Sequence, residues 1–319
     1  MTDQLEPPIS SDTLSQKLRR SAELLFLKAV RLYTFNTPIA KGKYRAFLLA
    51  RRICRNTPDG LDTELNDGRR FSIDFSSNMQ DTLYFLGEYE KVITGFVEDL
   101  IRERGCKVFV DAGANFGWYT TLFAKYAGTR GEVHAFEPVP KTFENLRRNY
   151  EQMGSPPNVK INNLALGEAE SDAVINLFPD EPIGHASLSD HGHANAISFS
   201  CKIVRLDDYL ETNQVSKVDF VKVDIEGAEL KLLKGAERLF RQQAPPIFLM
   251  EMALKQTKSF GYLPDDLIKF FRSRADYQFF KIDEISERLI EIDGFAPDDI
   301  GANVLCIPRD SGLSERPPE

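Results

Sequence analysis

The stretch Val108-Phe109-Val110-Asp111-Ala112-Gly113-Ala114-Asn115-Phe116-Gly117 decides the fold of this chain. Its first residues predict a buried strand that ends in an acid, and its glycines predict a loop that opens a helix over residues 118–128. A second predicted strand, over 132–137, also ends in an acid, Glu137. Because parallel strands meet a ligand at their carboxyl ends, Asp111 and Glu137 should both face a crevice at that edge.

The spacing of the glycines narrows the class of ligand. A dinucleotide loop follows G-x-G-x-x-G, and its middle glycine lets a pyrophosphate approach the backbone. Here the loop is Gly113-Ala114-Asn115-Phe116-Gly117, which lacks that glycine, and Asp111 would repel a phosphate. An adenosine joined to a cationic amino acid fits better, with Glu137 at the ribose hydroxyls, and S-adenosylmethionine is that molecule. The alternative is an ordinary turn with a solvated Asp111.

The composition excludes several classes of protein. The 319 residues, with 42% hydrophobic residues and 23 Phe, suffice for one large domain or for one domain with an extension. No run of 18 apolar residues predicts a membrane span, and the acidic, proline-containing residues 1–11 are unlike a secretory signal. The cysteines show no paired spacing, which is typical of reduced thiols in the cytoplasm rather than of disulfides or zinc sites: Cys54, Cys106, Cys201 and Cys306.

Charge is distributed unevenly along the chain. Residues 1–56 carry a net charge of +7, and the remainder carries −15. Apolar residues at three- and four-residue steps predict an amphipathic helix over 13–35, and a second basic, apolar segment follows: Leu14, Leu18, Ala22, Leu25, Ala29 and Leu32. We expect residues 1–61 to form a basic helical extension packed on the main domain. Contact of residues 13–56 with an anionic membrane or an acidic partner is the alternative, and the acidic remainder disfavours nucleic acid.

The main domain is expected over residues 62–307 and has the pattern of an α/β fold. A hairpin around Asn66-Asp67-Gly68 and a helix over 87–104 precede the first core strand. Strands then alternate with helices, which predicts a doubly wound, mostly parallel sheet. The predicted strands are 107–111, 132–137, 158–164, 218–224 and 246–251, with helices at 118–128, 140–152, 228–240 and 263–273. Extra strands are predicted at 171–178 and 197–205, an antiparallel pair at 277–283 and 302–307 at the sheet edge, and a disordered tail over 308–319.

A second buried strand, Val218 to Asp224, carries charged residues. Strand alternation puts Phe220, Lys222 and Asp224 on one face. Charges inside a core strand are costly unless they pair or reach a crevice, so Lys222 should hold Asp224 ionised at the strand tip. Asp224 could contact substrate, act as general base or bind a metal, or it could only organise the turn. Glu226 and Glu229 could take part in the chemistry or stabilise the start of the next helix.

Other polar residues follow the remaining strands. Glu251 ends the strand expected beside Asp224 and could close an acidic site around a hydroxyl group or a divalent ion such as Mg²⁺. Asn163 and Leu164 end the third strand, where an adenine would lie. His134 is expected to be a core histidine. The loop 182–196 could be an active-site lid or a mobile segment, and it holds three histidines: His185, His191 and His193.

Taken together, these motifs resemble those of FkbM-type methyltransferases. The resemblance rests on Asp111–Gly117, Phe136-Glu137-Pro138, Leu206-Asp207-Asp208-Tyr209 and Lys222–Glu229, with Leu233 and Gly235 after them. Tyr89-Glu90 resembles the acid-bearing helix that this family places before its first strand. The resemblance covers roughly residues 62–307. It implies a Rossmann-like class I methyltransferase fold, with a mostly parallel seven-stranded sheet and an antiparallel edge strand.

The resemblance also implies a function and a set of site residues. The expected activity is transfer of a methyl group from S-adenosylmethionine to a hydroxyl of a sugar, glycolipid or other small metabolite. Asp224, nearest the methyl group, would be catalytic together with Lys222, Glu226 and Glu251. Related enzymes often carry a histidine soon after the acid at position 251, and this chain has Met252. The expected cofactor-binding residues are Glu90, Asp111, Ala112, Gly113, Asn115, Gly117, Glu137, Pro138, Asn163, Leu164 and Asp224.

Two other functions are compatible with such a sheet. A nucleotide-dependent oxidoreductase is one, and the missing middle glycine and Asp111 count against it. A non-catalytic binding protein that docks through its basic arm is the other. The intact set of Asp111, Glu137 and Asp224 counts against that interpretation, because a pocket without turnover has no need of all three.

Overall fold

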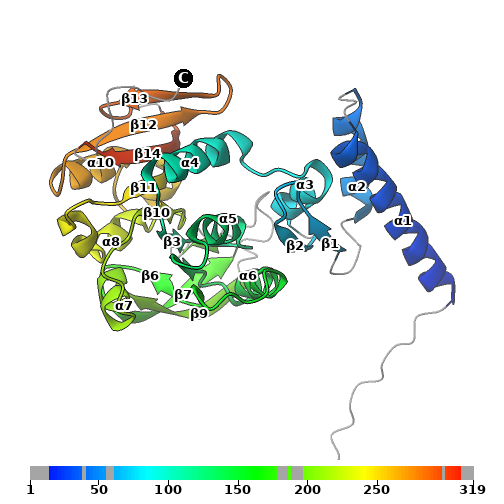
Figure 1. Ribbon diagram of the computed structural model, residues 1–319, viewed down its shortest axis with the longest axis horizontal. Coiled ribbons are helices and arrows are strands. Elements are labelled where there is room, and N and C mark those ends of the chain that lie inside the picture. The colour runs from blue at the N-terminus through cyan, green and yellow to red at the C-terminus, as the bar shows by residue number, and fades with distance from the viewer. Residues whose placement is uncertain are drawn as a thin grey trace, which may run out of the picture. The chain divides into compact units, whose positions relative to one another are not determined.

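The computed structural model describes residues 14–37, 41–54, 61–75, 77–177, 186–187, 197–296 and 299–309. These residues form two compact units (Figure 1). The first unit contains the described residues up to Thr63 together with Ile73–Glu88, and the second contains Glu64–Ser72 and the described residues from Tyr89 onward. Every predicted catalytic or cofactor-binding residue lies in the second unit.

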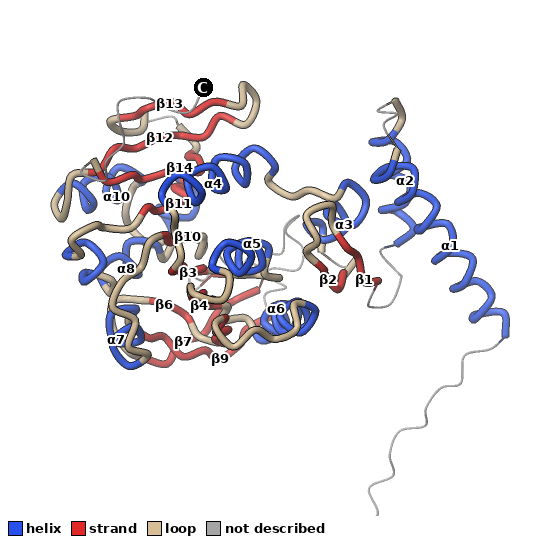
Figure 2. Tube along the Cα trace, viewed as in Figure 1, coloured by secondary structure: helices blue, strands red, loops and turns tan. Residues whose placement is uncertain are grey.

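An eight-stranded sheet forms the centre of the second unit (Figures 1 and 2), in the order β13-β12-β14-β11-β10-β3-β4-β5. Strands β5, β4, β3, β10 and β11 are parallel, and β14 runs antiparallel to both β11 and β12. The bounds are β3 (Val108–Ala112), β4 (Glu132–Phe136), β5 (Val159–Asn162), β10 (Phe220–Val223), β11 (Ile247–Ala253), β12 (Tyr277–Asp283), β13 (Arg288–Ile292) and β14 (Gly301–Pro308). The predicted Rossmann-like fold is therefore confirmed.

The sheet differs from the prediction at one edge. The predicted antiparallel pair is present as β12 and β14. However, β14 lies between β11 and β12 rather than at the edge, and the hairpin strand β13 adds an eighth strand beyond β12. The side chains of β13 are exposed or half-buried. Its sequence, Arg-Leu-Ile-Glu-Ile, therefore lacks the buried apolar run by which the other strands were predicted.

Helices pack against both faces of this sheet. On one face, Phe109 and Phe220 lie against Phe123 of α5, with ring centroids 4.8 and 5.6 Å apart. Their neighbours Val110 and Val221 point to the other face, into a core that α7, α8 and α10 share. The helix bounds are α4 (Lys91–Arg104), α5 (Trp118–Ala127), α6 (Pro140–Gln152), α7 (Leu206–Thr212), α8 (Glu229–Lys234), α9 (Leu254–Ser259) and α10 (Pro264–Arg272), with a 3₁₀ helix, η1 (Glu237–Arg241).

A smaller sheet has the order β6-β9-β7-β8. Its strands are β6 (Ala165–Leu166), β7 (Ser171–Leu177), β8 (Ala186–Ser187) and β9 (Ile197–Val204). The strands predicted at 171–178 and 197–205 are thus present as β7 and β9, which pair antiparallel. The histidines of the predicted lid and residues 310–319 of the predicted tail lie outside the described residues, so both of those interpretations stay predictions.

The helix predicted over 87–104 is wrong at its start. Helix α3 (Asn78–Leu86) ends at Gly87, which has φ +75° and donates its N–H to the carbonyl of Leu83. Glu90 also has a positive φ, +46°, immediately before α4. Because a right-handed helix cannot continue through left-handed residues, the chain forms two helices here. The hairpin is present as predicted, with β1 (Leu61–Glu64), β2 (Arg70–Ile73) and a turn at Asn66–Gly68.

The first unit is helical. It contains α1 (Leu14–Asn36), α2 (Lys43–Cys54) and α3, so the helix predicted over 13–35 is confirmed. The face of α1 that is buried differs from the predicted stripe, because Leu27 and Val30 are buried whereas Leu18, Leu25 and Leu32 are exposed. Among the described residues, no helix has the length and apolar character needed to cross a bilayer.

Candidate functional site

The carboxyl ends of four parallel strands carry four of the acids that the sequence singles out. Asp111 is the second-last residue of β3, and Glu251 lies in the last part of β11. Glu137 directly follows β4, and Asp224 directly follows β10. The register pairs Lys222 with Asp111 across β10 and β3. These side chains therefore gather at one edge of the sheet, as predicted for a ligand site.

Asp111 is fully buried beneath this edge. Its Oδ2 accepts a hydrogen bond from the hydroxyl of Thr120, at 2.6 Å, while Oδ1 has no partner among the described residues. Burial raises the pKa of Asp111, and the charge of Lys222 opposes that rise. Because a buried acceptor without a donor is costly, Oδ1 is a candidate acceptor for a donor group of a bound ligand.

The loop after β3 packs directly on the loop after β10. Gly113 has φ +78°, and a Cβ atom there would lie 1.8 Å from the carbonyl oxygen of Asp224. The N–H groups of Gly113 and Ala114 both donate to the carbonyl of Phe136, at 3.0 and 2.9 Å. Asp224 in turn donates its own N–H to the carbonyl of Ala112. Only glycine fits position 113, so the first glycine of the motif is required by this close approach.

Glu137 holds the other side of the same loop. Its Oε2 accepts the N–H of Asn115, at 2.9 Å, and its Oε1 accepts the N–H of Val139, at 3.0 Å. Asn115 has φ +50° and Gly117, which precedes α5, has φ +93°. Burial raises the pKa of Glu137 to about 7. Each carboxylate oxygen keeps a second lone pair, so Glu137 can still accept hydrogen bonds from ligand hydroxyls.

Asn163 fixes the backbone that follows Glu137. Its side-chain amide donates to the carbonyl oxygens of Glu137 and Pro138, at 2.8 and 3.1 Å. Leu164 is half-buried against the core. The side chain of Asn163 thus has a clear structural task, which the sequence pattern did not indicate.

Lys222 is the cation at the centre of the site. Its Nζ lies 3.1 Å from Oδ2 of Asp224 and 3.3 Å from the carbonyl oxygen of Gly113, and its side chain is only 9% exposed. Burial by itself lowers the pKa of Lys222, but the carboxylates of Asp224, Asp111 and Glu90 outweigh burial and raise it. The ammonium therefore stays charged, and the predicted pairing of Lys222 with Asp224 is present.

Two residues of α5 that sequence reasoning missed complete the buried network. Tyr119 donates its hydroxyl to Oε2 of Glu90, at 2.8 Å, and Thr120 bonds Asp111. Burial raises the pKa of Glu90. The available signal was the polar run Tyr119-Thr120-Thr121 directly after the glycine loop, in a helix whose other inward residues are apolar.

The side chains of Asp224, Glu226 and Glu251 form a cluster of three carboxylates at the strand tips. One oxygen of each lies within 4.8 Å of the others. The charge of Asp224 and then burial raise the pKa of Glu251 well above its usual range, and its carboxyl is hydrogen-bonded to Asp224. Gln256 donates to Glu226, at 3.3 Å. At neutral pH we therefore expect Glu251 to keep its proton, shared with Asp224, unless a cation binds among the three.

Glu229 closes the turn at the start of α8. It is 1% exposed, its Oε1 accepts the N–H of Gly227 at 2.9 Å, and its Oε2 accepts the hydroxyl of Tyr262 at 2.8 Å. Burial raises the pKa of Glu229 to about 7. Of the two interpretations of Glu229, the geometry favours the structural one.

The variant Glu229→Gln is expected to remove part of the pH dependence of stability. A carboxyl whose folded pKa lies above its unfolded value binds more protons when folded, so it lowers stability as pH rises from about 4.5 to about 7. The amide can accept from Gly227 and donate to the Tyr262 hydroxyl, which also donates to the Gly227 carbonyl. Urea unfolding measures the free energy of unfolding at pH 5 and at pH 8. From pH 5 to pH 8 this free energy should fall less for the variant than for the wild type, by ~1 kcal/mol or more. Equal losses in both proteins would contradict this.

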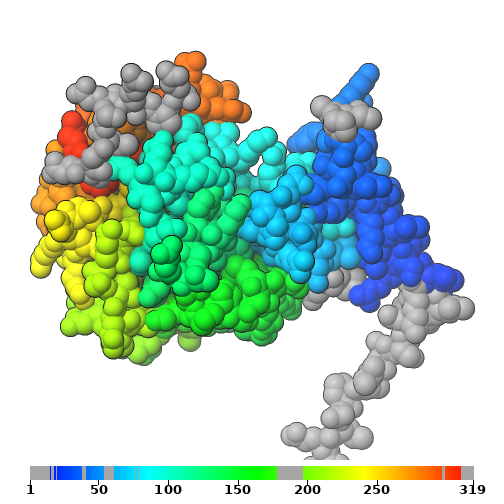
Figure 3. Space-filling view, viewed as in Figure 1, coloured from blue at the N-terminus to red at the C-terminus, as the bar shows by residue number. Residues whose placement is uncertain are grey.

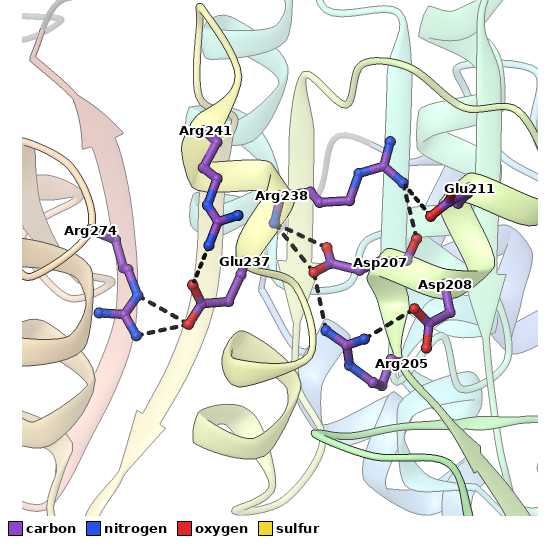
Figure 4. Close-up of polar contacts among 8 residues, drawn as sticks. All are labelled: Arg205, Asp207, Asp208, Glu211, Glu237, Arg238, Arg241 and Arg274. Atoms are coloured by element: carbon purple, nitrogen blue, oxygen red, sulfur yellow. Dashed lines mark hydrogen bonds and ion pairs between the residues drawn. The ribbon is translucent and has the colours of Figure 1, made fainter.

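The Leu206–Tyr209 motif supports the site without entering it. Asp207 accepts the backbone N–H of Arg238, at 3.1 Å, and contacts the guanidinium of Arg205, at 3.4 Å (Figure 4). Nearby, Glu237 contacts both Arg241 and Arg274 in a separate group of ion pairs (Figure 4). These contacts attach the start of α7 to η1.

Tyr209 packs against residues of β4. Its ring packs edge-on against Phe136, with centroids 4.7 Å apart, and its hydroxyl accepts from Asn162 at 3.1 Å. The hydroxyl also lies 3.2 Å from Nδ1 of His134, whose Nε2 faces Glu132. His134 is fully buried, so its predicted place in the core is confirmed.

Comparison with known proteins identifies the family of this chain. The family described as the methyltransferase FkbM domain matches residues 111–279. The chain belongs to the FkbM methyltransferase family. The matched segment contains every predicted site residue except Glu90, and the resemblance predicted from the motifs is confirmed.

Individual relatives share only a modest fraction of their sequence with this chain. Methyltransferase 1 of Beauveria bassiana is 29% identical over 146 residues, which are 40% of this chain and 57% of the relative. The hexuronic acid methyltransferase AglP of Haloferax volcanii is 32% identical over 128 residues, 40% of this chain and 49% of the relative. The chain thus spans about half the length of these relatives. The crystal structure of a methyltransferase FkbM from Methylobacillus flagellatus has 15% identity and a TM-score of 0.41, with 91% of this chain and 60% of that chain covered.

Proposed function

We propose that this FkbM-family protein transfers a methyl group from S-adenosylmethionine to a hydroxyl of a sugar, a glycolipid or another small metabolite. The observation that carries the proposal is the meeting of Asp111, Glu137 and Asp224 at one edge of the sheet, around the Gly113 loop. A relative named as a hexuronic acid methyltransferase supports a sugar as acceptor.

The residues at this edge fit the proposed cofactor. Asp111 offers a buried oxygen without a partner among the described residues, which suits the ammonium of the methionine part. Glu137 has lone pairs left for the ribose hydroxyls. Ala112, Gly113, Asn115 and Gly117 would shape the pocket, and Glu90, Pro138, Asn163 and Leu164 would border it. When bound, S-adenosylmethionine supplies an electrophilic methyl group on its sulfonium.

Asp224 is the proposed acceptor of the hydroxyl proton. Its carboxylate is 38% exposed at the strand tip, while Lys222 behind it favours the ionised form. Glu251, which holds a proton beside it, can hydrogen-bond the same carboxylate and orient it. Positioning the hydroxyl supplies much of the rate, and proton removal adds to it. A carboxylate oxygen of Glu226 lies within 4.8 Å of one of Asp224.

A divalent ion bound by the three carboxylates is the second candidate for activating the acceptor hydroxyl. Carboxylate oxygens of Asp224, Glu226 and Glu251 lie within 4.8 Å of one another, a donor set that suits Mg²⁺. Such an ion would lower the pKa of the acceptor hydroxyl. Turnover that EDTA abolishes and Mg²⁺ restores would assign this role. Turnover that is indifferent to both would leave Asp224 as the base.

We also propose that the chain consists of a catalytic domain and an N-terminal extension. Residues 62–307 would form the methyltransferase domain, and residues 1–61 would form an extension outside it. The three described free cysteines, Cys106, Cys201 and Cys306, are buried, which suits a protein that acts in the reducing cytoplasm.

Calorimetry on the full chain tests the proposed cofactor. We expect S-adenosylmethionine to bind and NADH not to bind. Asp111→Ala should weaken binding by about 10- to 100-fold, because a charged hydrogen bond contributes ~1.5–3 kcal/mol. Asp293→Ala, at an exposed acid outside the edge, is the matched control and should bind as the wild type does. Binding of NADH instead would support an oxidoreductase, and unchanged binding by Asp111→Ala would remove Asp111 from the site.

A further inference from the structure

Helix α1 presents an apolar stripe that its own unit does not cover. Leu18, Leu25 and Leu32 are 64%, 71% and 63% exposed, and Ala22 and Ala29 between them are exposed as well. Their spacing alternates between four and three residues, so the five side chains lie along one side of the helix. Figure 3 shows α1 (dark blue) at the surface along most of its length. Exposed leucines in such an aligned row indicate a surface that meets a partner.

The core of the unit is built from the other side of α1. Leu27, Val30 and Thr34 are buried there, and the Thr34 hydroxyl donates to the carbonyl of Phe85 in α3. The guanidinium of Arg31 lies over the ring of Tyr84, at 4.8 Å. Because these contacts hold α1 in place, the exposed leucines contribute little to the fold of the unit and can be substituted without unfolding it.

The charges around the stripe indicate the chemistry of the partner. Helix α1 contains five basic residues and a single acid, Glu23, and Lys28 is exposed beside the stripe. Pairing two copies of the chain through this stripe would bring two helices of net charge +4 together, which like-charge repulsion opposes. An anionic partner removes that repulsion.

Helix α2 has the same character. It exposes Tyr44, Leu48 and Leu49, and its cations Arg45 and Arg52 are exposed too. A groove on a protein fits the apolar face of one helix, whereas a lipid surface accepts apolar and basic side chains from two neighbouring helices. Tyrosine is also a favoured residue at the boundary between water and lipid.

We propose that α1 docks on the surface of an anionic lipid bilayer. The stripe of Leu18, Leu25 and Leu32 enters the boundary of the acyl chains, and the exposed cation Lys28, which flanks the stripe, meets the headgroups. Among the described residues no helix can cross the bilayer, so the contact is peripheral.

Co-sedimentation of the full chain with vesicles tests this docking. The wild type should bind vesicles of phosphatidylcholine mixed with phosphatidylglycerol, and should bind phosphatidylcholine alone at least ~10-fold more weakly. The triple variant Leu18→Ser, Leu25→Ser, Leu32→Ser should lose about 10-fold or more of the binding to the mixed vesicles. The variant Lys28→Glu should weaken binding to the mixed vesicles and reduce its dependence on salt.

Matched controls make each outcome decisive. Ile285→Ser, at a residue 98% exposed in the second unit, should bind as the wild type does. Circular dichroism should show that the triple variant keeps its helices. Equal binding by the triple variant, equal binding to neutral and anionic vesicles, or absence of binding by the wild type would each overturn the proposal. Light scattering that shows a dimer, lost in the triple variant, without vesicle binding would assign the stripe to self-association instead.

Discussion

Asp224→Asn is expected to lower kcat by about 100- to 10,000-fold, the range that a general base contributes. Asparagine keeps the shape of the side chain and an oxygen for Lys222, which lies 3.1 Å from Asp224, but it cannot accept a proton. The loss should therefore fall on kcat more than on the KM of the acceptor. Steady-state kinetics with a methylatable sugar and S-adenosylmethionine measure both constants.

Glu251 makes this prediction sharper. The charge of Asp224 is the first cause of the raised pKa of Glu251, so neutral asparagine lowers that pKa and lets Glu251 ionise more readily. Residual activity of Asp224→Asn should then depend on Glu251 and disappear in the double variant with Glu251→Gln. Asp293→Asn, at an exposed acid paired with Arg272, is the control and should keep full activity. An unchanged kcat in Asp224→Asn would rule out Asp224 as the base.

Gly113→Ala is expected to destabilise the fold by ~3 kcal/mol or more and to eliminate binding of S-adenosylmethionine. The added Cβ would lie 1.8 Å from the carbonyl oxygen of Asp224, which is backbone and cannot rotate away. The loops after β3 and β10 would have to separate. That separation moves Asp111 and Asp224 apart, so stability and binding should fall together in urea unfolding and calorimetry.

Gly105→Ala separates the clash from the strain of a positive φ. Gly105 has φ +61°, and a Cβ there would meet no atom within 4 Å. Its substitution should therefore cost only the strain, ~1 kcal/mol, and leave binding intact. If both variants lose the same stability, the close approach of the two loops is not what requires glycine at position 113.

Local pattern was sufficient for the frame of the site. Strands with apolar runs ending in Asp111 and Glu137, separated by a helix, could only form a parallel unit with both acids at one edge. The two-residue period of a strand puts Lys222 and Asp224 on the same face. These features depend on residues adjacent in the chain, and the structure agrees with them.

Tertiary packing decided what each polar group does. Lys222 contacts the carbonyl of Gly113, 109 residues away, and Asn163 holds the backbone after β4. The proton on Glu251 depends on its distance from Asp224, which no spacing in the sequence encodes.

The same distinction applies to the first helix. The spacing of Leu18, Leu25 and Leu32 predicts a helix with an apolar side, and α1 is that helix. Periodicity cannot say what covers the apolar side, and in the structure Leu27 and Val30 fill the core while the three leucines stay exposed. A sequence determines which side chains share a face, because that follows from local backbone geometry. Only the folded chain decides which face is buried and which charges meet, because burial and pairing depend on residues far apart in sequence.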